Sequence, residues 1–281
     1  MTQHPALASG RVAVITGGAS GIGLAAARRF VALGMRVCIV DRTAGALEEA
    51  ARELERLAGD GAGAVMATVA DVRREADMLA LRDRVHAAWG EVGVLMNNAG
   101  IEPPSSALVA SESWRDIIDT NLWGVIHGTH AFAQAMAAQG TPCAIINTGS
   151  KQGITCPPGN PAYNISKAGV KVFSEALAHE LRSGAGPQVS VHLLVPGFTF
   201  TGLTRATEKP AGAWTPGQVV DFMIERMAAG DFYIICPDNE VTREIDNRRM
   251  TWAMQDVTEN RPPLSRWHPD YAEAFRRFME S

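Results

Sequence analysis

The sequence predicts an α/β fold in which helices cover both faces of a parallel sheet of about seven strands. Short runs rich in β-branched residues alternate with longer amphipathic stretches, which is typical of repeated βαβ units. A glycine-rich turn separates the first strand from the first helix, and polar residues follow nearly every strand. Together these features favour a Rossmann-type, doubly wound sheet.

Each predicted strand is a short apolar run, and all but the last are followed by a cluster of Gly, Asn, Ser or Asp. The seven runs cover residues 12–16, 36–40, 64–69, 94–97, 144–148, 189–195 and 232–235. Because the carboxyl ends of parallel strands meet at one edge of a sheet, we expect these polar clusters to lie together. Open α/β sheets bind their ligands at that edge.

One domain is predicted over residues 1–281, because this length and a hydrophobic content of 46% suffice for a single substantial core. Within it, residues 198–230 are rich in Gly, Pro and Thr, carry Trp214 and end in a predicted helix, which indicates a lid over the substrate. Residues 258–281 form a C-terminal tail that packs either on a neighbouring subunit or on its own chain.

Composition excludes several classes of function. The net charge is −4 and the basic residues are scattered, so no nucleic-acid partner is expected. The four cysteines are far apart and form no CxxC pair or Cys/His cluster, which predicts reduced thiols and no metal site. The start of the chain lacks a signal-peptide pattern, and no apolar stretch reaches the roughly 18 residues of a membrane span. We therefore expect a cytoplasmic protein without a membrane partner.

The turn after the first predicted strand is a candidate site for a dinucleotide pyrophosphate. Its backbone N–H groups and the dipole of the following helix attract phosphate, and glycine allows a close approach. The residues concerned are Gly17, Ser20, Gly21, Ile22 and Gly23. A glycine-rich turn before a helix can also be purely structural. The absence of a following Gly-Lys-Ser/Thr excludes a P-loop.

Asp41 stands at the end of the second predicted strand, where dinucleotide-binding folds place an acid that binds the ribose hydroxyls. A carboxylate there repels a 2′-phosphate and favours NAD. The adjacent Arg42 could instead accept NADP, but Ser20 supplies no second positive charge, so NAD remains the prediction. The alternative is that Asp41 only caps the turn.

Tyr163 and Lys167 are four residues apart, and this spacing places them on one face of a helix. A free phenol has a pKa of about 10, too high for a base at neutral pH, and a nearby ammonium is predicted to lower it. Taken alone, the pair could equally be a surface tyrosine beside a solvated lysine.

Five motifs in this order and spacing resemble those of the short-chain dehydrogenase/reductase family over residues 11–201. TGxxxGxG and NNAG lie after the first and fourth predicted strands, a helix asparagine and a serine follow, and YxxxK comes next. A Pro-Gly segment after the sixth strand is also similar. The matching residues are Thr16, Gly17, Gly21, Gly23, Asn97, Asn98, Ala99, Gly100, Asn121, Ser150, Tyr163, Lys167, Pro196, Gly197, Thr199 and Thr201.

The resemblance implies a role for each catalytic position. Tyr163 would act as general acid and base, Lys167 would lower its pKa and hold the nicotinamide ribose, and Ser150 would bind the substrate oxygen. Asn121 would complete a proton route through a water molecule. The remaining implied cofactor contacts are Asp71 and Val72 at the adenine, Asn98, Ala99 and Gly100 along the adenosine, and Pro196, Gly197, Thr199 and Thr201 at the nicotinamide.

The substrate is less well predicted. Phe198, Phe200 and Trp214, with Met223, suggest an apolar or aromatic substrate, although such residues also simply close a core. Gln152 is either a substrate contact or a solvated loop residue. Thr199 stands where the family usually has an aliphatic residue, but the contact expected there is made by backbone.

The sequence therefore predicts an NAD-dependent oxidoreductase that acts on a secondary alcohol or ketone. A catalytically silent NAD-binding regulatory protein is the alternative, but it would be expected to lack part of the Asn, Ser, Tyr and Lys set. The glycine spacing and chain length disfavour an epimerase or dehydratase. The family resemblance also implies a homotetramer or homodimer that assembles through the helices containing Asn121 and Tyr163.

Overall fold

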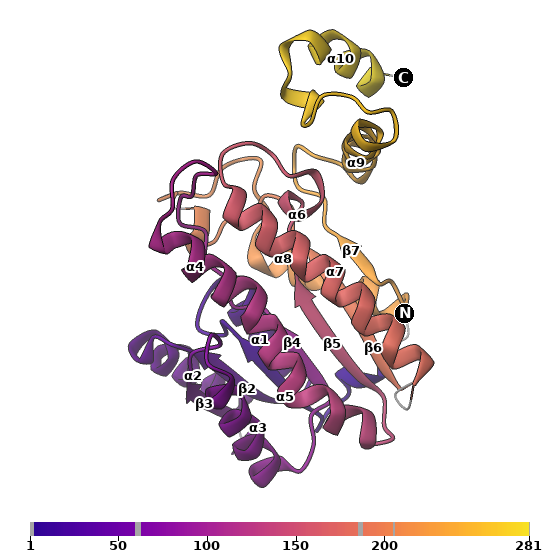
Figure 1. Ribbon diagram of the computed structural model, residues 1–281. Helices are drawn as coiled ribbons and strands as arrows, with labels where there is room; N and C mark the ends of the chain where they lie inside the picture. The colour runs from indigo at the N-terminus through magenta and orange to yellow at the C-terminus, as the bar shows by residue number, and fades with distance from the viewer. Residues whose placement is uncertain (1–2, 60–62, 185–187, 205, 281) are drawn as a thin grey trace.

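A seven-stranded parallel sheet with strand order β3-β2-β1-β4-β5-β6-β7 forms the centre of the protein and confirms the predicted fold (Figure 1). The computed structural model describes residues 3–59, 63–184, 188–204 and 206–280. The strands are β1 (Val12–Thr16), β2 (Arg36–Asp41), β3 (Val65–Val69), β4 (Val94–Asn97), β5 (Cys143–Thr148), β6 (Val189–Val195) and β7 (Tyr233–Ile235).

The strand register explains the small differences from the predicted bounds. Asp41 pairs with Val69, which extends β2 by one residue, and Cys143 pairs with Val189, which starts β5 one residue early. The chain order reverses between β1 and β4, so the two halves of the sheet diverge there. Such a switch point opens a crevice at the carboxyl ends of the strands.

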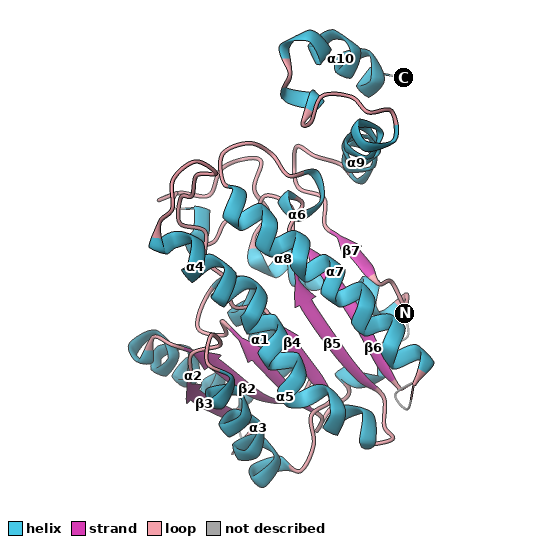
Figure 2. Ribbon diagram, viewed as in Figure 1, coloured by secondary structure: helices cyan, strands magenta, loops and turns pink. Residues whose placement is uncertain are grey.

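Helices cover both faces of the sheet (Figure 2). The first layer contains α1 (Gly21–Ala32), α2 (Ala44–Ala58) and α8 (Pro216–Ala228). The second contains α3 (Glu75–Trp89), α5 (Gly124–Ala138) and α7 (Pro161–Ser183), with α4 (Glu112–Ile118) leading into α5. Alternation along β1 divides the core, because Ala13 and Ile15 pack with the first layer while Val12 and Val14 pack with the second.

The segment 198–230 contains two different structures. Its first residues run along the crevice, and Thr199 forms a bridge with Trp214. Helix α8 packs against α1, and its Val219 and Met223 are fully buried in the core. Helix α8 therefore belongs to the core and not to a lid, and a lid formed by the residues before it stays a prediction.

The C-terminal residues form a helical pair, α9 (Arg243–Thr258) and α10 (Ala272–Glu280), which lies beyond the end of the sheet (Figure 1). The Trp252 ring is 5.2 Å from the rings of both Phe275 and Phe278, and the Arg261 guanidinium stacks on it at 4.2 Å. The tail thus packs back on its own chain, and contact with a neighbouring subunit stays open. Short helix α6 (Gln152–Thr155) contacts α9.

The four cysteines are free thiols, and burial raises the pKa of Cys38 and of Cys236 to about 12. No cluster of three or more His, Cys, Asp or Glu suited to a metal ion occurs among the residues that the structure describes. Within the same residues, none of the helices combines the length and the apolar character needed to cross a membrane.

Candidate active site

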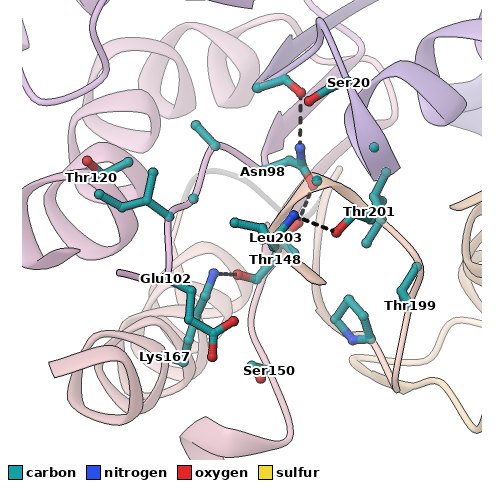
Figure 3. A pocket seen from close by; sticks show the side chains of 18 of the residues that line it. Ser20, Asn98, Glu102, Thr120, Thr148, Ser150, Lys167, Thr199, Thr201 and Leu203 are labelled. Carbon is teal, nitrogen blue, oxygen red and sulfur yellow. Dashed lines mark hydrogen bonds between the residues drawn. The ribbon is translucent and has the colours of Figure 1, made fainter. Parts of the chain in front are cut away.

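A cavity of about 680 Å³ lies at the carboxyl ends of the strands, on the side where the sequence predicts the ligand (Figure 3). This volume is within the usual range for small-molecule and cofactor sites. The structure brings most of the predicted residues to its wall. These are Gly17, Ser20, Gly21, Ile22, Asp41, Arg42, Asp71, Val72, Asn98, Ala99, Gly100, Ser150, Gln152, Tyr163, Lys167, Pro196, Gly197, Phe198, Thr199 and Thr201.

The glycine-rich turn is tied to the segment that follows β4. Thr16 Oγ1 accepts hydrogen bonds from the backbone N–H groups of Asn98 and Ala99, at 2.9 and 3.2 Å, and Asn98 Nδ2 donates to the Thr16 carbonyl at 3.2 Å. Gly23 is outside the cavity wall that the described residues form. A Cβ at Gly23 would lie 2.2 Å from the Gly17 carbonyl oxygen, so this glycine allows α1 to start directly against the turn.

The acidic residues at the ends of β2 and β3 form the far end of the cavity. Asp41 Oδ1 accepts the backbone N–H of Thr43 at 3.1 Å, so Asp41 caps the turn and still faces the cavity. Asp71 binds Arg73 at 2.6 Å, and the guanidinium of Arg73 lowers the pKa of Asp71. The charge of Arg42 adds a smaller contribution to this lowering.

The other end of the cavity holds Ser150, Tyr163 and Lys167. Ser150 follows β5, and α6 then packs closely on α7, which carries Tyr163 and Lys167. A Cβ at Gly153 of α6 would lie 2.4 Å from the Lys167 carbonyl carbon, so the close approach of the two helices requires glycine. This approach places the hydroxyls of Ser150 and Tyr163 within hydrogen-bond reach of each other.

The protonation state of this end is set by burial. Burial raises the pKa of Tyr163 well above its usual value, the carboxylate of Glu102 raises it further, and the hydrogen bond with Ser150 partly opposes both. Burial and Glu102 therefore dominate this pKa, and the lowering expected from Lys167 stays a prediction. Lys167 Nζ is 5.8 Å from the Tyr163 ring centroid and donates to the Thr148 carbonyl at 2.8 Å (Figure 3). Burial lowers the pKa of Lys167 to about 8.

Asn121 lies behind the cavity and positions part of its wall. It sits in a π-helical turn, Asp119–Trp123, between α4 and α5, and is fully buried. Its Oδ1 accepts the backbone N–H of Ile101 at 2.8 Å, and its Nδ2 donates to the Ile101 carbonyl at 2.9 Å. π-Helical turns are frequent at functional sites. Here the turn directs one amide side chain to both backbone groups of the residue that follows Gly100.

Two of the predicted substrate residues lie apart from the cavity. Among the described residues that form its wall, Gln152 and Phe198 are present, whereas Phe200 and Trp214 are not. The Trp214 ring packs on Phe222 of α8 at 5.9 Å, and the Phe200 N–H donates to the Trp214 carbonyl at 2.8 Å. These two residues join the wall segment to α8.

Glu102 and Lys151 also line the cavity, and the sequence did not single out either as a site residue. Glu102 follows the NNAG motif by two positions, which is the signal that could have identified it. Lys151 follows Ser150, and its ammonium is 2.6 Å from the Asp246 carboxylate of α9 and 3.6 Å from that of Asp238. Only the tertiary structure reveals this link between the C-terminal helical pair and the loop of Ser150.

The sequence is similar to those of known dehydrogenases. A family model described as short chain dehydrogenase matches residues 11–211. Galactitol 2-dehydrogenase (L-tagatose-forming) of Cereibacter sphaeroides is 37% identical over 72% of this chain and 76% of its own. The NADP-dependent (R)-specific alcohol dehydrogenase of Lentilactobacillus kefiri is 35% identical over 71% of this chain and 77% of its own.

A solved structure is similar over nearly the whole chain. The short chain dehydrogenase/reductase of Burkholderia phymatum in complex with NAD superimposes with a TM-score of 0.82 and 29% identity, covering 94% of this chain and 98% of that one. The family match, the relatives and the shared fold agree with the motifs gathered around the cavity. The chain belongs to the short-chain dehydrogenase/reductase family of oxidoreductases.

Proposed function

We propose that this protein moves a hydride between NAD(H) and a secondary alcohol or its ketone. The observation that carries the proposal is the position of Ser150, Tyr163 and Lys167 at one end of a cavity whose other end presents Asp41. The nicotinamide supplies or accepts the hydride when bound. The chain provides binding, orientation and the proton.

The cavity fits a dinucleotide. The start of α1 faces it with the backbone of Gly21 and Ile22, which suits a pyrophosphate. The carboxylates of Asp41 and Asp71 face its far end, as ribose and adenine binding would require. The proposed nicotinamide contacts, from Pro196 to Thr201, line the wall near the tyrosine end.

Tyr163 is proposed to exchange the proton with the substrate oxygen, and Ser150 to donate a hydrogen bond to the same oxygen. The phenol of Tyr163 carries its proton at neutral pH, as an unperturbed phenol also would, so it can donate to a ketone oxygen and must lose that proton before it can accept one from an alcohol. Burial and the Glu102 carboxylate raise the pKa of Tyr163 and hold the proton more firmly. Lys167 places a positive charge beneath the site and fixes the Thr148 carbonyl.

NAD is proposed over NADP on electrostatic grounds. The Asp41 carboxylate would repel a 2′-phosphate, and Ser20 in the glycine-rich turn supplies no second positive charge beside Arg42 to attract one. A fluorescence titration with NADH and, separately, NADPH tests this choice without knowledge of the substrate. We expect NADH to bind at least about tenfold more tightly, because one repulsive contact at this range contributes on the order of 1 kcal/mol or more.

Asp41→Ala is the informative variant for this titration. Removal of the carboxylate should weaken NADH and strengthen NADPH, so that the ratio of the two dissociation constants falls toward one. Glu48→Ala, an exposed glutamate on the neighbouring α2, serves as the matched control and should leave the ratio unchanged. An unchanged ratio in Asp41→Ala would mean that Asp41 only caps the turn through Thr43.

A catalytically silent regulatory protein is not favoured, because Asn121, Ser150, Tyr163 and Lys167 are all present.

Self-association is proposed through α5 and α7. Three large apolar side chains on these helices are unusually exposed. They are Ile165 (52%) and Val172 (62%) on α7, and Trp123 (46%) in the π-helical turn before α5. Sedimentation of the purified protein distinguishes monomer, dimer and tetramer.

A further inference from the structure

Glu102 places a carboxylate at the reacting end of the cavity, where its charge opposes the proposed chemistry. Together with burial, this carboxylate raises the pKa of Tyr163, so it disfavours the phenolate that alcohol oxidation requires. It would also repel the negative charge that develops on a substrate oxygen. Figure 3 shows the Glu102 carboxylate at the same end of the cavity as Lys167 and Ser150.

The backbone on both sides of Glu102 is fixed by buried or half-buried amides. Asn121 binds both the N–H and the carbonyl of Ile101, at 2.8 and 2.9 Å. On the other side, Asn160 Nδ2 donates to the Pro103 carbonyl at 3.0 Å, and Pro104 follows. The backbone of this segment is therefore held in place, and this keeps Glu102 at the wall of the cavity.

The side chain itself is oriented by Gln152, whose Nε2 donates to Glu102 Oε1 at 3.1 Å. An ionised carboxylate has about four acceptor positions and no donor. Among the described residues, Gln152 provides the hydrogen bond to this carboxylate, so most of the acceptor capacity of Glu102 remains for a ligand in the cavity that it lines. A group with this character recognises hydrogen-bond donors.

The charges around this end also exclude acidic substrates. Besides Lys167, Lys151 carries a positive charge at this end of the cavity. Its ammonium already pairs with Asp246 at 2.6 Å and with Asp238 at 3.6 Å. Lys167 donates one hydrogen bond to the Thr148 carbonyl. Among the described residues at this end, a carboxylate or phosphate on the substrate would therefore face the Glu102 carboxylate, while the nearest cation outside the catalytic set, Lys151, is already paired with two carboxylates.

We propose that Glu102 selects substrates with a second hydroxyl next to the reacting carbon, that is, vicinal diols and the corresponding hydroxyketones. The second hydroxyl donates a hydrogen bond to the Glu102 carboxylate while the reacting oxygen faces Tyr163 and Ser150. This inference rests on the proposed dehydrogenase function and specifies its substrate class. It assigns to Glu102 and Gln152 the specificity of the site.

Three four-carbon probes of similar size test the proposal: butane-2,3-diol, butan-2-ol and 3-hydroxybutyrate. Oxidation of each is measured with the cofactor that binds more tightly. We expect wild-type kcat/KM to be at least about tenfold higher for the diol than for butan-2-ol, since a hydrogen bond to a charged acceptor contributes about this factor. 3-Hydroxybutyrate should be the poorest of the three.

Glu102→Ala should bring the kcat/KM for the diol close to that for butan-2-ol, mainly by raising KM for the diol. The affinity for NADH should stay unchanged. Glu102→Gln should increase kcat/KM for 3-hydroxybutyrate, because the repulsive charge is gone and the side-chain volume is kept. Glu48→Gln is the matched control and should change none of these values.

Several outcomes would overturn the proposal. A wild-type enzyme that turns over butan-2-ol as well as the diol, or that prefers the acid, contradicts it. An equal loss of kcat/KM for the diol and for butan-2-ol in Glu102→Ala also contradicts it, because this result indicates a merely structural role of Glu102. NADH binding without turnover of any probe refutes the substrate class alone. Failure of both NADH and NADPH to bind refutes the proposed function itself.

Discussion

Tyr163→Phe is expected to lower kcat by about 10²- to 10⁴-fold, which is the usual contribution of a positioned general acid or base. The phenyl ring keeps the packing of Tyr163 against Ile117 and Ala162, so only the hydroxyl is lost. The affinity for NADH should change by less than about threefold. Steady-state kinetics with the best substrate, together with fluorescence titration, measure both values.

The chain offers a matched control for this variant. Tyr233 is 44% exposed and its hydroxyl hydrogen-bonds to Glu175 on α7, away from the cavity wall. Tyr233→Phe removes the same atom and should leave kcat within about twofold. If Tyr163→Phe retained most of the wild-type kcat, Tyr163 would not be the proton donor, and the proposed chemistry would have to be abandoned.

Lys167→Met is expected to change activity and stability in opposite directions. The fully buried ammonium has its pKa lowered from 10.5 to about 8, so the folded state holds this charge at a cost of roughly 3 kcal/mol at most. Loss of the hydrogen bond to Thr148 offsets about 1 kcal/mol. At pH 7 the variant should therefore be more stable by about 1–2 kcal/mol, while kcat falls at least about a hundredfold.

The pH dependence of stability gives a second readout for the same variant. Between about pH 8 and 10.5 the unfolded lysine binds more protons than the folded one, so the stability of the wild type rises with pH through this window. Lys167→Met should lack this rise when urea denaturation is compared at each pH. If the free energy of unfolding rose equally with pH in wild type and variant, burial would not be lowering the pKa of Lys167.

Lys171→Met separates this effect from the loss of any lysine on α7. Lys171 lies one turn after Lys167, is half-buried, and pairs with Glu175 at 2.7 Å. Its removal should cost well under 1 kcal/mol at every pH and leave kcat unchanged. A stabilisation by Lys171→Met as large as that by Lys167→Met would point to a general property of the helix surface.

The alternation of apolar runs with amphipathic stretches was enough to predict a parallel sheet of seven strands and every strand bound to within one residue, because period-two and helical patterns follow directly from burial on a layered fold. Local motifs likewise identified the residues at both ends of the cavity. Each of these residues lies at the carboxyl end of a strand or on a helix face, and a short stretch of sequence encodes such positions.

Distances between segments remote in the sequence were decided only by the tertiary structure. The pKa of Tyr163 depends on burial and on Glu102, neither of which the YxxxK spacing contains. Asn121 acts on the wall through Ile101 because a π-helical turn rotates its side chain toward that backbone. Trp214 looked like a substrate contact, but it packs on α8 because its bridge to Thr199 turns it from the cavity.

The sequence by itself therefore predicted the layered fold from local periodicity, and it predicted the cofactor turn and the Ser150, Tyr163 and Lys167 set through the resemblance of their motifs to those of a known family. Electrostatics and shape at the substrate end were decided by the tertiary structure. There Glu102, the Lys151–Gln152 pair and Asp246 come from three separate segments. The physical reason is that burial and charge interaction depend on distance in space, which a linear pattern does not record.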